Sequence, residues 1–232
     1  MKTEIFCDSA DLKTIKKFNN NPLVKGFTTN PSLIKATGAK NYKKYSLKLL
    51  KASKNKPISI EVFADNFEQM LKQANIINLW GKNVYVKIPV VNSKGSFSGK
   101  VIKELSKKGI KINITAVYTS QQVKKIIKHI NKKSKTIISI FAGRMGDAGK
   151  DPVPIIKNSV KLTKKFKNVK ILWASTREAY NYLQAQESRC SIITMPPAII
   201  EKISKFGMSY QELTLDTVKK FLKDSKDCNF KI

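Results

Sequence analysis

The amino-acid sequence predicts an α/β protein built as a single (β/α)8 TIM barrel over residues 1–232, with an extra C-terminal helix at about residues 209–226. Eight short apolar, β-branched runs recur along the chain, and their starts lie 19 to 35 residues apart. Most gaps carry an amphipathic helical pattern, which favours parallel strands joined by helical crossovers. No Gly/Pro/Ser-rich linker interrupts the series. Eight units without a spare edge strand favour a closed barrel over the alternative, an open doubly wound sheet.

Each predicted strand is an apolar run that ends where polar residues begin. The runs are Glu4–Cys7, Leu23–Phe27, Ile58–Phe63, Val84–Ile88, Ile110–Ile114, Thr136–Phe141, Val169–Trp173 and Ser191–Thr194. The segments between them place apolar residues at helical spacing and lysines elsewhere, as in Val123–Ile130. After the eighth strand, Ser209 to Lys226 has the spacing of one more helix. Such a helix packs on its own barrel or on a neighbouring subunit more often than it carries chemistry.

Polar side chains follow seven of the eight predicted strands. The strands of a barrel end together at one mouth, and active sites lie there. The residues at these ends are Asp8, Thr28, Thr29, Asn30, Glu61, Lys87, Asn113, Thr115, Ser139, Arg144, Ser175 and Arg177. We therefore expect the functional site at this mouth.

Lys87 differs from the other lysines because it interrupts the apolar strand Val84–Val91. Strands of a barrel are covered on both faces, so the ammonium group at this position is poorly solvated. Desolvation favours the neutral amine, which is the form that a Schiff-base nucleophile requires. The alternatives are a lysine that extends out to water at the strand end and one that pairs with a carboxylate for structural reasons.

Asp8 and Glu61 are the carboxylates at the ends of apolar strands. Two carboxylates facing one amine can support imine chemistry, one as a base on a substrate hydroxyl and the other through water. For Asp8 the alternative is a cap on the helix that follows, a role that Ser9 could also fill. For Glu61 the alternative is a structural ion pair with Lys87, which would oppose a neutral amine.

Two of the three arginines, Arg144 and Arg177, follow the sixth and seventh strands, where barrels often bind phosphate. In a chain that otherwise uses lysine, a retained arginine indicates a need for its planar, two-pronged donor group. Ser175–Glu178 matches the S-x-x-E capping box, so Ser175 is either a helix cap or part of an anion site at that helix N-terminus. Arg189 precedes the eighth strand and is expected at the surface.

The chain is strongly basic, with 45 Lys+Arg against 16 Asp+Glu and a formal net charge of +29. Such a charge first suggests a nucleic-acid-binding protein, because lysines neutralise phosphates. The seven Lys-Lys doublets are spread through segments of helical spacing, without a basic tail or an aromatic-rich ribbon. We interpret the excess as solvated helix faces and keep nucleic-acid binding as the alternative of another functional class.

Histidine and cysteine usage narrows the chemistry further. The single histidine, His129, excludes a zinc site of two or three histidines, and Cys7, Cys190 and Cys228 form no C-x-x-C motif. The N-terminus has no signal-peptide apolar region, and no apolar run approaches the ~18 residues of a membrane span. We expect a cytoplasmic protein without membrane or nucleic-acid partners.

Five motifs occur in a specific order. They are Gly26–Leu33 (GFTTNPSL), Val86–Pro89 (VKIP), Asn113–Ala116 (NITA), Ser139–Arg144 (SIFAGR) and Ala174–Arg177 (ASTR). From Asp8 to about residue 222 the chain resembles the transaldolase family, in particular the short transaldolases that share a subfamily with fructose-6-phosphate aldolase. The resemblance implies a class I mechanism that needs no metal or cofactor. It also implies a homo-oligomer, a pentamer or decamer, in which the C-terminal helix reaches a neighbour.

The resemblance implies a role for each residue at the mouth. Lys87 would form a Schiff base with the ketose C2 carbonyl, and Asp8 would take the proton of the C4 hydroxyl. Glu61, with a water held by Thr115, would transfer protons as the carbinolamine forms and dehydrates. The other residues would bind sugar phosphates: Asn30, Asn113 and Ser139 the dihydroxyacetone part, Arg144, Ser175 and Arg177 the phosphate, with Thr29 and Phe141 completing the site.

The implied reaction belongs to the pentose phosphate pathway. It transfers a dihydroxyacetone unit from sedoheptulose 7-phosphate to glyceraldehyde 3-phosphate and gives erythrose 4-phosphate and fructose 6-phosphate. The alternative within the family is an aldolase that releases free dihydroxyacetone from fructose 6-phosphate. Aldolase members carry Gln where this chain has Glu61 and Tyr where it has Phe141, so both positions favour transaldolase. The chain departs from the family pattern at Ile140 and at Met145–Asp147.

Overall fold

Eight parallel strands close into a barrel in sequence order in the computed structural model, which describes residues 2–228. The strands are β1 (Glu4–Asp8), β2 (Val24–Thr28), β3 (Ile58–Glu61), β4 (Val84–Pro89), β5 (Ile112–Val117), β6 (Thr136–Ile140), β7 (Val169–Trp173) and β8 (Ile192–Met195). Strand β1 pairs with both β2 and β8. The (β/α)8 prediction is therefore confirmed, and the open sheet is wrong because the first and last strands are hydrogen-bonded to each other.

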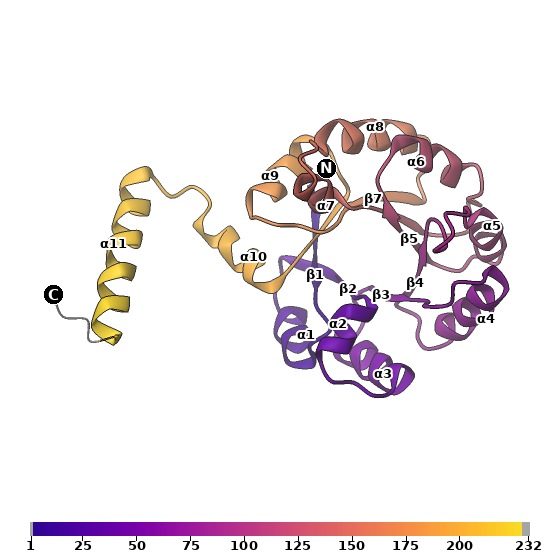
Figure 1. Cartoon of the computed structure of the whole chain (residues 1–232), viewed down its shortest axis with the longest axis horizontal. Helices are drawn as coiled ribbons and strands as arrows, with labels where there is room; N and C mark the ends of the chain where they lie inside the picture. The colour runs from indigo at the N-terminus through magenta and orange to yellow at the C-terminus, as the bar shows by residue number, and fades with distance from the viewer. Residues whose placement is uncertain (1, 229–232) are drawn as a thin grey trace. The chain divides into compact units, whose positions relative to one another are not determined.

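Helices fill the connections between the strands, and two more helices follow β8. They are α1 (Leu12–Asn19), α2 (Pro31–Ala36), α3 (Tyr42–Ser53), α4 (Phe67–Asn78), α5 (Gly99–Lys107), α6 (Ser120–Ile127), α7 (Ala142–Asp147), α8 (Val153–Thr163), α9 (Tyr180–Glu187), α10 (Pro197–Lys202) and α11 (Tyr210–Asp227). Figure 1 shows α3, α4, α5, α6 and α8 on the outside of the strands. Asp11, Asn41, Asn66 and Thr119 cap α1, α3, α4 and α6 through their side-chain oxygens, as helix N-termini require.

The observed strands follow the predicted runs, with local shifts at their beginnings and ends: β3 ends at Glu61 and not at Phe63, and β5 continues to Val117. Strand β5 begins at Ile112 and not at Ile110, because the Ile110 N–H donates to Leu105 O and so belongs to the end of α5. Gly109, with a φ of 71°, makes the left-handed turn that ends this helix. Strand β2 begins at Val24, since the N–H of Leu23 is turned to the side chain of Asn21.

The interior of the barrel is packed with side chains below the mouth. Phe6, Ile137, Leu172, Ala174 and Ile192 form a buried cluster, against which Tyr85 and Phe141 pack. Phe6 needs a glycine beside it, because a Cβ at Gly26 would lie 2.6 Å from the Phe6 ring. This apolar cluster fills the interior of the barrel below the mouth, so the polar side chains at the strand ends stay at the mouth.

The chain divides into two compact units, Met1–Ile200 and Glu201–Ile232. In the second unit, Ser209 and Glu212 form a reciprocal capping box at the start of α11. Helix α11 agrees with the helix predicted at about 209–226. It exposes an apolar set of side chains: Leu213, Leu215, Val218, Phe221 and Leu222. Among the described residues, no helix is both long and apolar enough to cross a membrane.

Candidate active site

A cavity of about 200 Å³ opens where the strands end. Nine of the twelve residues predicted for the site line it: Asp8, Asn30, Lys87, Thr115, Ser139, Phe141, Arg144, Ser175 and Arg177. Thr29, Glu61 and Asn113 do not line the cavity. Thr29 and Glu61 each contact the Lys87 amine, and Asn113 accepts a hydrogen bond from Ser139. These side chains were predicted to meet at one mouth because the C-terminal ends of parallel strands lie at the same end of a barrel. The structure brings them together there.

Lys87 is the only buried lysine among the described residues, with 6% of its surface exposed. It lies opposite Glu61 in the register of β3 and β4, and its Nζ is 3.0 Å from Glu61 Oε2. The same Nζ donates to the carbonyl oxygen of Thr29 at 3.0 Å. The amine does not extend to water; it is held by one carboxylate and one carbonyl at the edge of the cavity. The ion pair between Glu61 and Lys87, which was the alternative interpretation of Glu61, is therefore present.

Asp8 lies at the end of β1 and accepts a hydrogen bond from Thr28 Oγ1 at 2.7 Å. Thr28 Oγ1 is also 2.5 Å from Thr194 Oγ1, so three strands contribute to this group. Burial raises the pKa of Asp8, while the Thr28 hydrogen bond and the charge of Lys87 act in the opposite direction. The alternative reading of Asp8 as the cap of α1 is wrong, since Asp11 takes that position and accepts from Thr14 N at 2.7 Å.

Asn113 connects three strands through its side-chain amide. Its Nδ2 donates to Ser59 Oγ at 2.9 Å, and its Oδ1 accepts from Ser139 Oγ at 2.7 Å. Both bonds fix the orientation of Ser139 beside the cavity. Asn30 is fixed in another way, because its Oδ1 caps α2 by accepting from Leu33 N at 2.8 Å, which leaves its amide nitrogen for other partners.

Thr115 lines the cavity beside an irregularity in β5. The register of β5 with β6 shifts between Ile114 and Val117, and Ala116 has a φ of 58°. Such a bulge redirects side chains near active sites. The buried Thr115 hydroxyl has no hydrogen-bond partner among the described residues, which is unusual for a buried polar atom. It is thus an unused polar group at the wall of the cavity.

The arginines of the mouth are both exposed and both have partners. The Arg144 guanidinium lies over the ring of Phe141, 5.8 Å from its centre. Arg177 donates from Nε to Asp147 Oδ1 at 3.0 Å, and its Nη2 also contacts Asp147. This hydrogen bonding keeps the pKa of Asp147 below its ordinary value.

The alternative reading of Ser175 as a helix cap is wrong, and the helix N-terminus expected beside it lies further along the chain. Helix α9 begins at Tyr180, and Ala179 precedes it without a side-chain cap. Ser175 has a φ of 63°, and the amide groups of Arg177 and Glu178 donate to Asn181 Oδ1 instead. Gly143 makes this backbone possible, because a Cβ there would lie 1.5 Å from Ser175 O. Ser175 therefore stays in the cavity wall.

Two residues that support the site, Thr194 and Tyr42, did not stand out as functional in the sequence, and Thr28 was placed at the mouth without a role. Thr194 lies near the end of the apolar strand β8, and this position was the signal that could have drawn attention to it. Tyr42 donates to the Glu61 carbonyl oxygen at 2.7 Å and ties α3 to the end of β3. Burial raises the pKa of this phenol, so it remains a donor at neutral pH. Tyr42 lies among helical lysines, where nothing in the sequence marks it.

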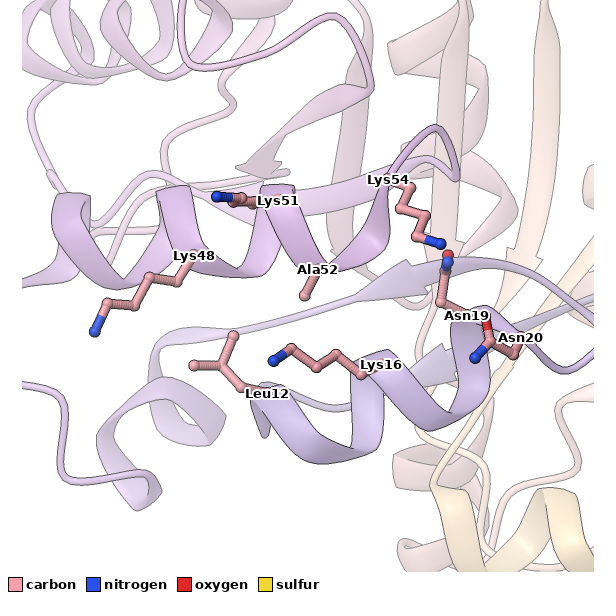
Figure 2. A pocket seen from close by; sticks show the side chains of 8 residues that line it. All are labelled: Leu12, Lys16, Asn19, Asn20, Lys48, Lys51, Ala52 and Lys54. Carbon is pink, nitrogen blue, oxygen red and sulfur yellow. The ribbon is translucent and has the colours of Figure 1, made fainter.

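A second hollow, of about 540 Å³, lies between α1 and α3. It is lined by Leu12, Lys16, Asn19, Asn20, Lys48, Lys51, Ala52 and Lys54. Figure 2 shows the Lys54 amine pointing toward Asn19, and the amines of Lys48 and Lys51 at separate places along α3. No carboxylate lines this hollow, whereas Asp8 and Lys87 both line the cavity at the barrel mouth.

Comparison with known proteins identifies the family of the chain. A model of the family described as transaldolase/fructose-6-phosphate aldolase matches residues 5–232. A protein of Nitrosopumilus maritimus described as "Probable transaldolase" is 32% identical over 95% of this chain and 94% of its own length. One of Methanococcus maripaludis strain C7, with the same description, is 31% identical over 95% of this chain and 96% of its own.

Solved structures show the same architecture at low sequence identity. N-acetylneuraminate lyase from Mycoplasma synoviae superposes with a TM-score of 0.55 and 11% identity, covering 82% of this chain and 68% of that one. This likeness concerns the fold alone. The barrel, the motifs at its strand ends and the match over nearly the full length together place the chain in a family. It belongs to the transaldolase/fructose-6-phosphate aldolase family.

Proposed function

We propose that this protein is a transaldolase that moves a dihydroxyacetone unit from sedoheptulose 7-phosphate to glyceraldehyde 3-phosphate. The observation that carries the proposal is the position of Lys87, a buried amine at the cavity wall with Glu61 3.0 Å away. An amine paired with a carboxylate at this distance becomes a neutral nucleophile by one proton transfer. Asp8 supplies a second carboxylate on the same cavity, as bond cleavage in a ketose requires.

In the first half of the reaction Lys87 attacks the ketose C2 carbonyl. The C–N bond forms as the carbonyl oxygen takes a proton, and the carbinolamine then loses water to give the protonated imine. Glu61 is placed to donate and accept these protons because it touches the reacting nitrogen. The Thr115 hydroxyl, buried and without a partner among the described residues, can position a water for the same transfers.

Carbon–carbon cleavage then requires a base at the C4 hydroxyl. Asp8 accepts that proton, the C3–C4 bond electrons flow into the protonated imine, and the aldehyde product leaves an enamine on Lys87. Addition of this enamine to the acceptor aldehyde reverses the steps and ends in hydrolysis of the imine. Burial raises the pKa of Asp8, which makes its carboxylate a better proton acceptor than one in water.

The remaining residues of the cavity are proposed to bind substrate. Asn30 and Ser139 hold the dihydroxyacetone hydroxyls from the lining, and Asn113 contributes from beside it through its hydrogen bond with Ser139. Thr29 orients Lys87 through its carbonyl oxygen. Arg144, Ser175 and Arg177 follow β6 and β7 and line the same cavity, where guanidinium groups suit a phosphate. Phe141 carries no hydroxyl that could protonate the enamine, and this supports transfer of the dihydroxyacetone unit over its release.

Borohydride trapping tests the proposal directly. Fructose 6-phosphate and borohydride should leave one reduced adduct on the Lys87 peptide, identified by mass spectrometry. Lys87→Ala should give none, while the matched surface variant Lys16→Ala should be labelled like the wild type. An adduct elsewhere, or none in the wild type, would overturn the assignment.

A second measurement separates transferase from aldolase. Fructose 6-phosphate turnover is followed with and without erythrose 4-phosphate as acceptor. A transaldolase consumes it only with the acceptor, whereas equal consumption without acceptor would identify an aldolase that releases dihydroxyacetone.

The exposed apolar set on α11 supports the further proposal that copies of the chain assemble, and the family resemblance implies a pentamer or decamer. Leu215, Phe221 and Leu222 each expose half or more of their surface, and solvent-exposed apolar groups in a row are typical of an interface. Phe221→Glu should shift the mass measured by light scattering to that of a smaller species. A wild-type monomer at micromolar concentration would refute assembly.

A further inference from the structure

The side chain of Arg177 is held along one edge. It follows β7 in a segment without regular structure, and about half of its side-chain surface is exposed. Its Nε donates to both carboxylate oxygens of Asp147, at 3.0 and 3.2 Å, and its Nη2 contacts Oδ2. Its backbone N–H donates to Asn181 Oδ1 at 3.1 Å. These contacts with described residues use Nε and Nη2 of the guanidinium group, and they leave the edge of the group that carries Nη1 for other partners.

Asp147 is the last residue of α7, the helix that also carries Arg144. This helix is locked against the segment after β7, because the Gly143 N–H donates to Ala174 O and Gly143 leaves no room for a Cβ beside Ser175. One short helix therefore presents Arg144 to the cavity and reaches across to hold Arg177. The spacing between the two guanidinium groups depends on Asp147.

The ion pair of Asp147 and Arg177 is exposed on both sides, so its contribution to folding stability is small. Its consequence for binding is larger. A free arginine side chain has several rotatable bonds, and a ligand that immobilises it must offset that loss of freedom. A carboxylate that already holds the Nε edge removes most of this cost before the ligand arrives.

We propose that Asp147 is a positioning residue, which orients Arg177 so that its remaining edge and Arg144 together receive the phosphate of the substrate. This inference rests on the proposed function, because it assigns the phosphate to these two arginines. Asp147 acts through Arg177 and does not touch the ligand. The hydrogen bonds from Arg177 keep the pKa of Asp147 low, so the carboxylate stays ionised throughout the neutral range.

Asp147→Asn tests the proposal by its effect on phosphorylated and unphosphorylated ligands. We expect KM for fructose 6-phosphate to rise by about 3- to 10-fold with kcat within about twofold, the size expected from disordering one long side chain. Borohydride trapping of Lys87 by unphosphorylated dihydroxyacetone should not change. Glu178→Gln, which removes an exposed carboxylate next to Arg177 in sequence, serves as the matched control and should leave both measurements unchanged.

A double variant shows whether Asp147 acts through Arg177. Arg177→Ala should raise KM more than Asp147→Asn does, and adding Asp147→Asn to it should cause no further increase. A lower KM in Asp147→Asn would overturn the proposal, because it would make the carboxylate a competitor of the phosphate. An unchanged KM, or an equal increase in both backgrounds, would also overturn it. Failure of the proposed function looks different, since wild-type Lys87 would then not be trapped by dihydroxyacetone.

Discussion

Lys87 and Glu61 face each other across two neighbouring strands, and their charged atoms are 3.0 Å apart. The register of β3 with β4 sets this pair, since it places the two residues side by side on the inner face of the barrel. Most of each side chain is shielded from water. A buried pair of this kind is stabilising only while both partners are present, and it is a poor source of stability compared with apolar packing.

The first prediction concerns this pair and separates stability from activity. Lys87→Met removes the nucleophile and puts an apolar side chain in its place, while the Glu61 side chain keeps 17% of its surface exposed to water. We therefore expect activity to fall at least about 10³-fold and the free energy of unfolding to fall by about 1 kcal/mol or less. Glu61→Gln removes the negative charge beside the buried ammonium and leaves it only neutral acceptors, the Thr29 carbonyl oxygen and the introduced amide oxygen, and should cost about 1 to 3 kcal/mol. Urea denaturation of both variants, with activity assays, checks the contrast. Equal destabilisation by both would refute it.

The second prediction concerns the pH dependence of activity. The Thr28 hydroxyl donates to Asp8 and lowers its pKa, so Thr28→Val should raise that pKa further. Because the base must be ionised, the acid limb of the kcat/KM profile should move to higher pH by about one unit, the size of a lost hydrogen bond to a charged group. Thr37→Val, which removes a hydroxyl bonded to the end of α2, is the control and should not move it. A shift to lower pH would contradict this account of Asp8.

The third prediction concerns the stability contributed by Asp8. Burial raises its pKa in the folded state, so the folded chain binds more protons than the unfolded chain between the two pKa values. The ionised carboxylate therefore destabilises the fold as pH rises through that interval. Asp8→Asn should raise Tm at pH 7, and the gain should shrink as pH falls through the raised pKa of Asp8 and vanish below the ordinary pKa of an aspartate. Calorimetry from pH 3.5 to 8 measures it, and a loss of Tm at pH 7 would exclude a destabilising role for this carboxylate.

The fourth prediction compares two glycines of α7. A Cβ at Gly143 would lie 1.5 Å from Ser175 O, so Gly143→Ala must push α7 away from the segment after β7. We expect a loss of about 2 kcal/mol or more together with weaker binding of phosphorylated substrates. Gly146 has nothing within 4 Å of its Cβ position and lies in the same helix, so Gly146→Ala should be neutral or stabilising by up to about 1 kcal/mol. Similar losses for both would show that the contact with Ser175 is unimportant.

The fifth prediction concerns thiol reactivity. Burial raises the pKa of both Cys7 and Cys190 to about 12, whereas Cys228 is exposed. The thiolate is the reactive form, so iodoacetamide at pH 8 should modify Cys228 alone in the folded protein and all three cysteines in urea. Peptide mass spectrometry distinguishes them. Modification of Cys7 without denaturant would mean that the end of β1 opens readily.

The sequence by itself determined the architecture and the location of the site. Eight apolar runs separated by helical segments leave few arrangements other than a barrel, and parallel strands necessarily bring their C-terminal residues to one mouth. For that reason Lys87, Asp8 and the two arginines of the cavity could be named from their positions alone. Lys87 was recognisable because a cation inside an apolar run conflicts with its surroundings.

Only the tertiary structure decided which of these groups contact each other. Asp147 holds Arg177, Thr28 bridges Asp8 to Thr194, and Asn181 accepts the hydrogen bond of the Arg177 backbone where a capping box by Ser175 was one alternative. The first two contacts join separate strand ends or loops. Local periodicity specifies the face on which a residue lies, but the side-chain rotamers and loop backbone at the mouth depend on close packing between distant segments, such as Gly143 against Ser175.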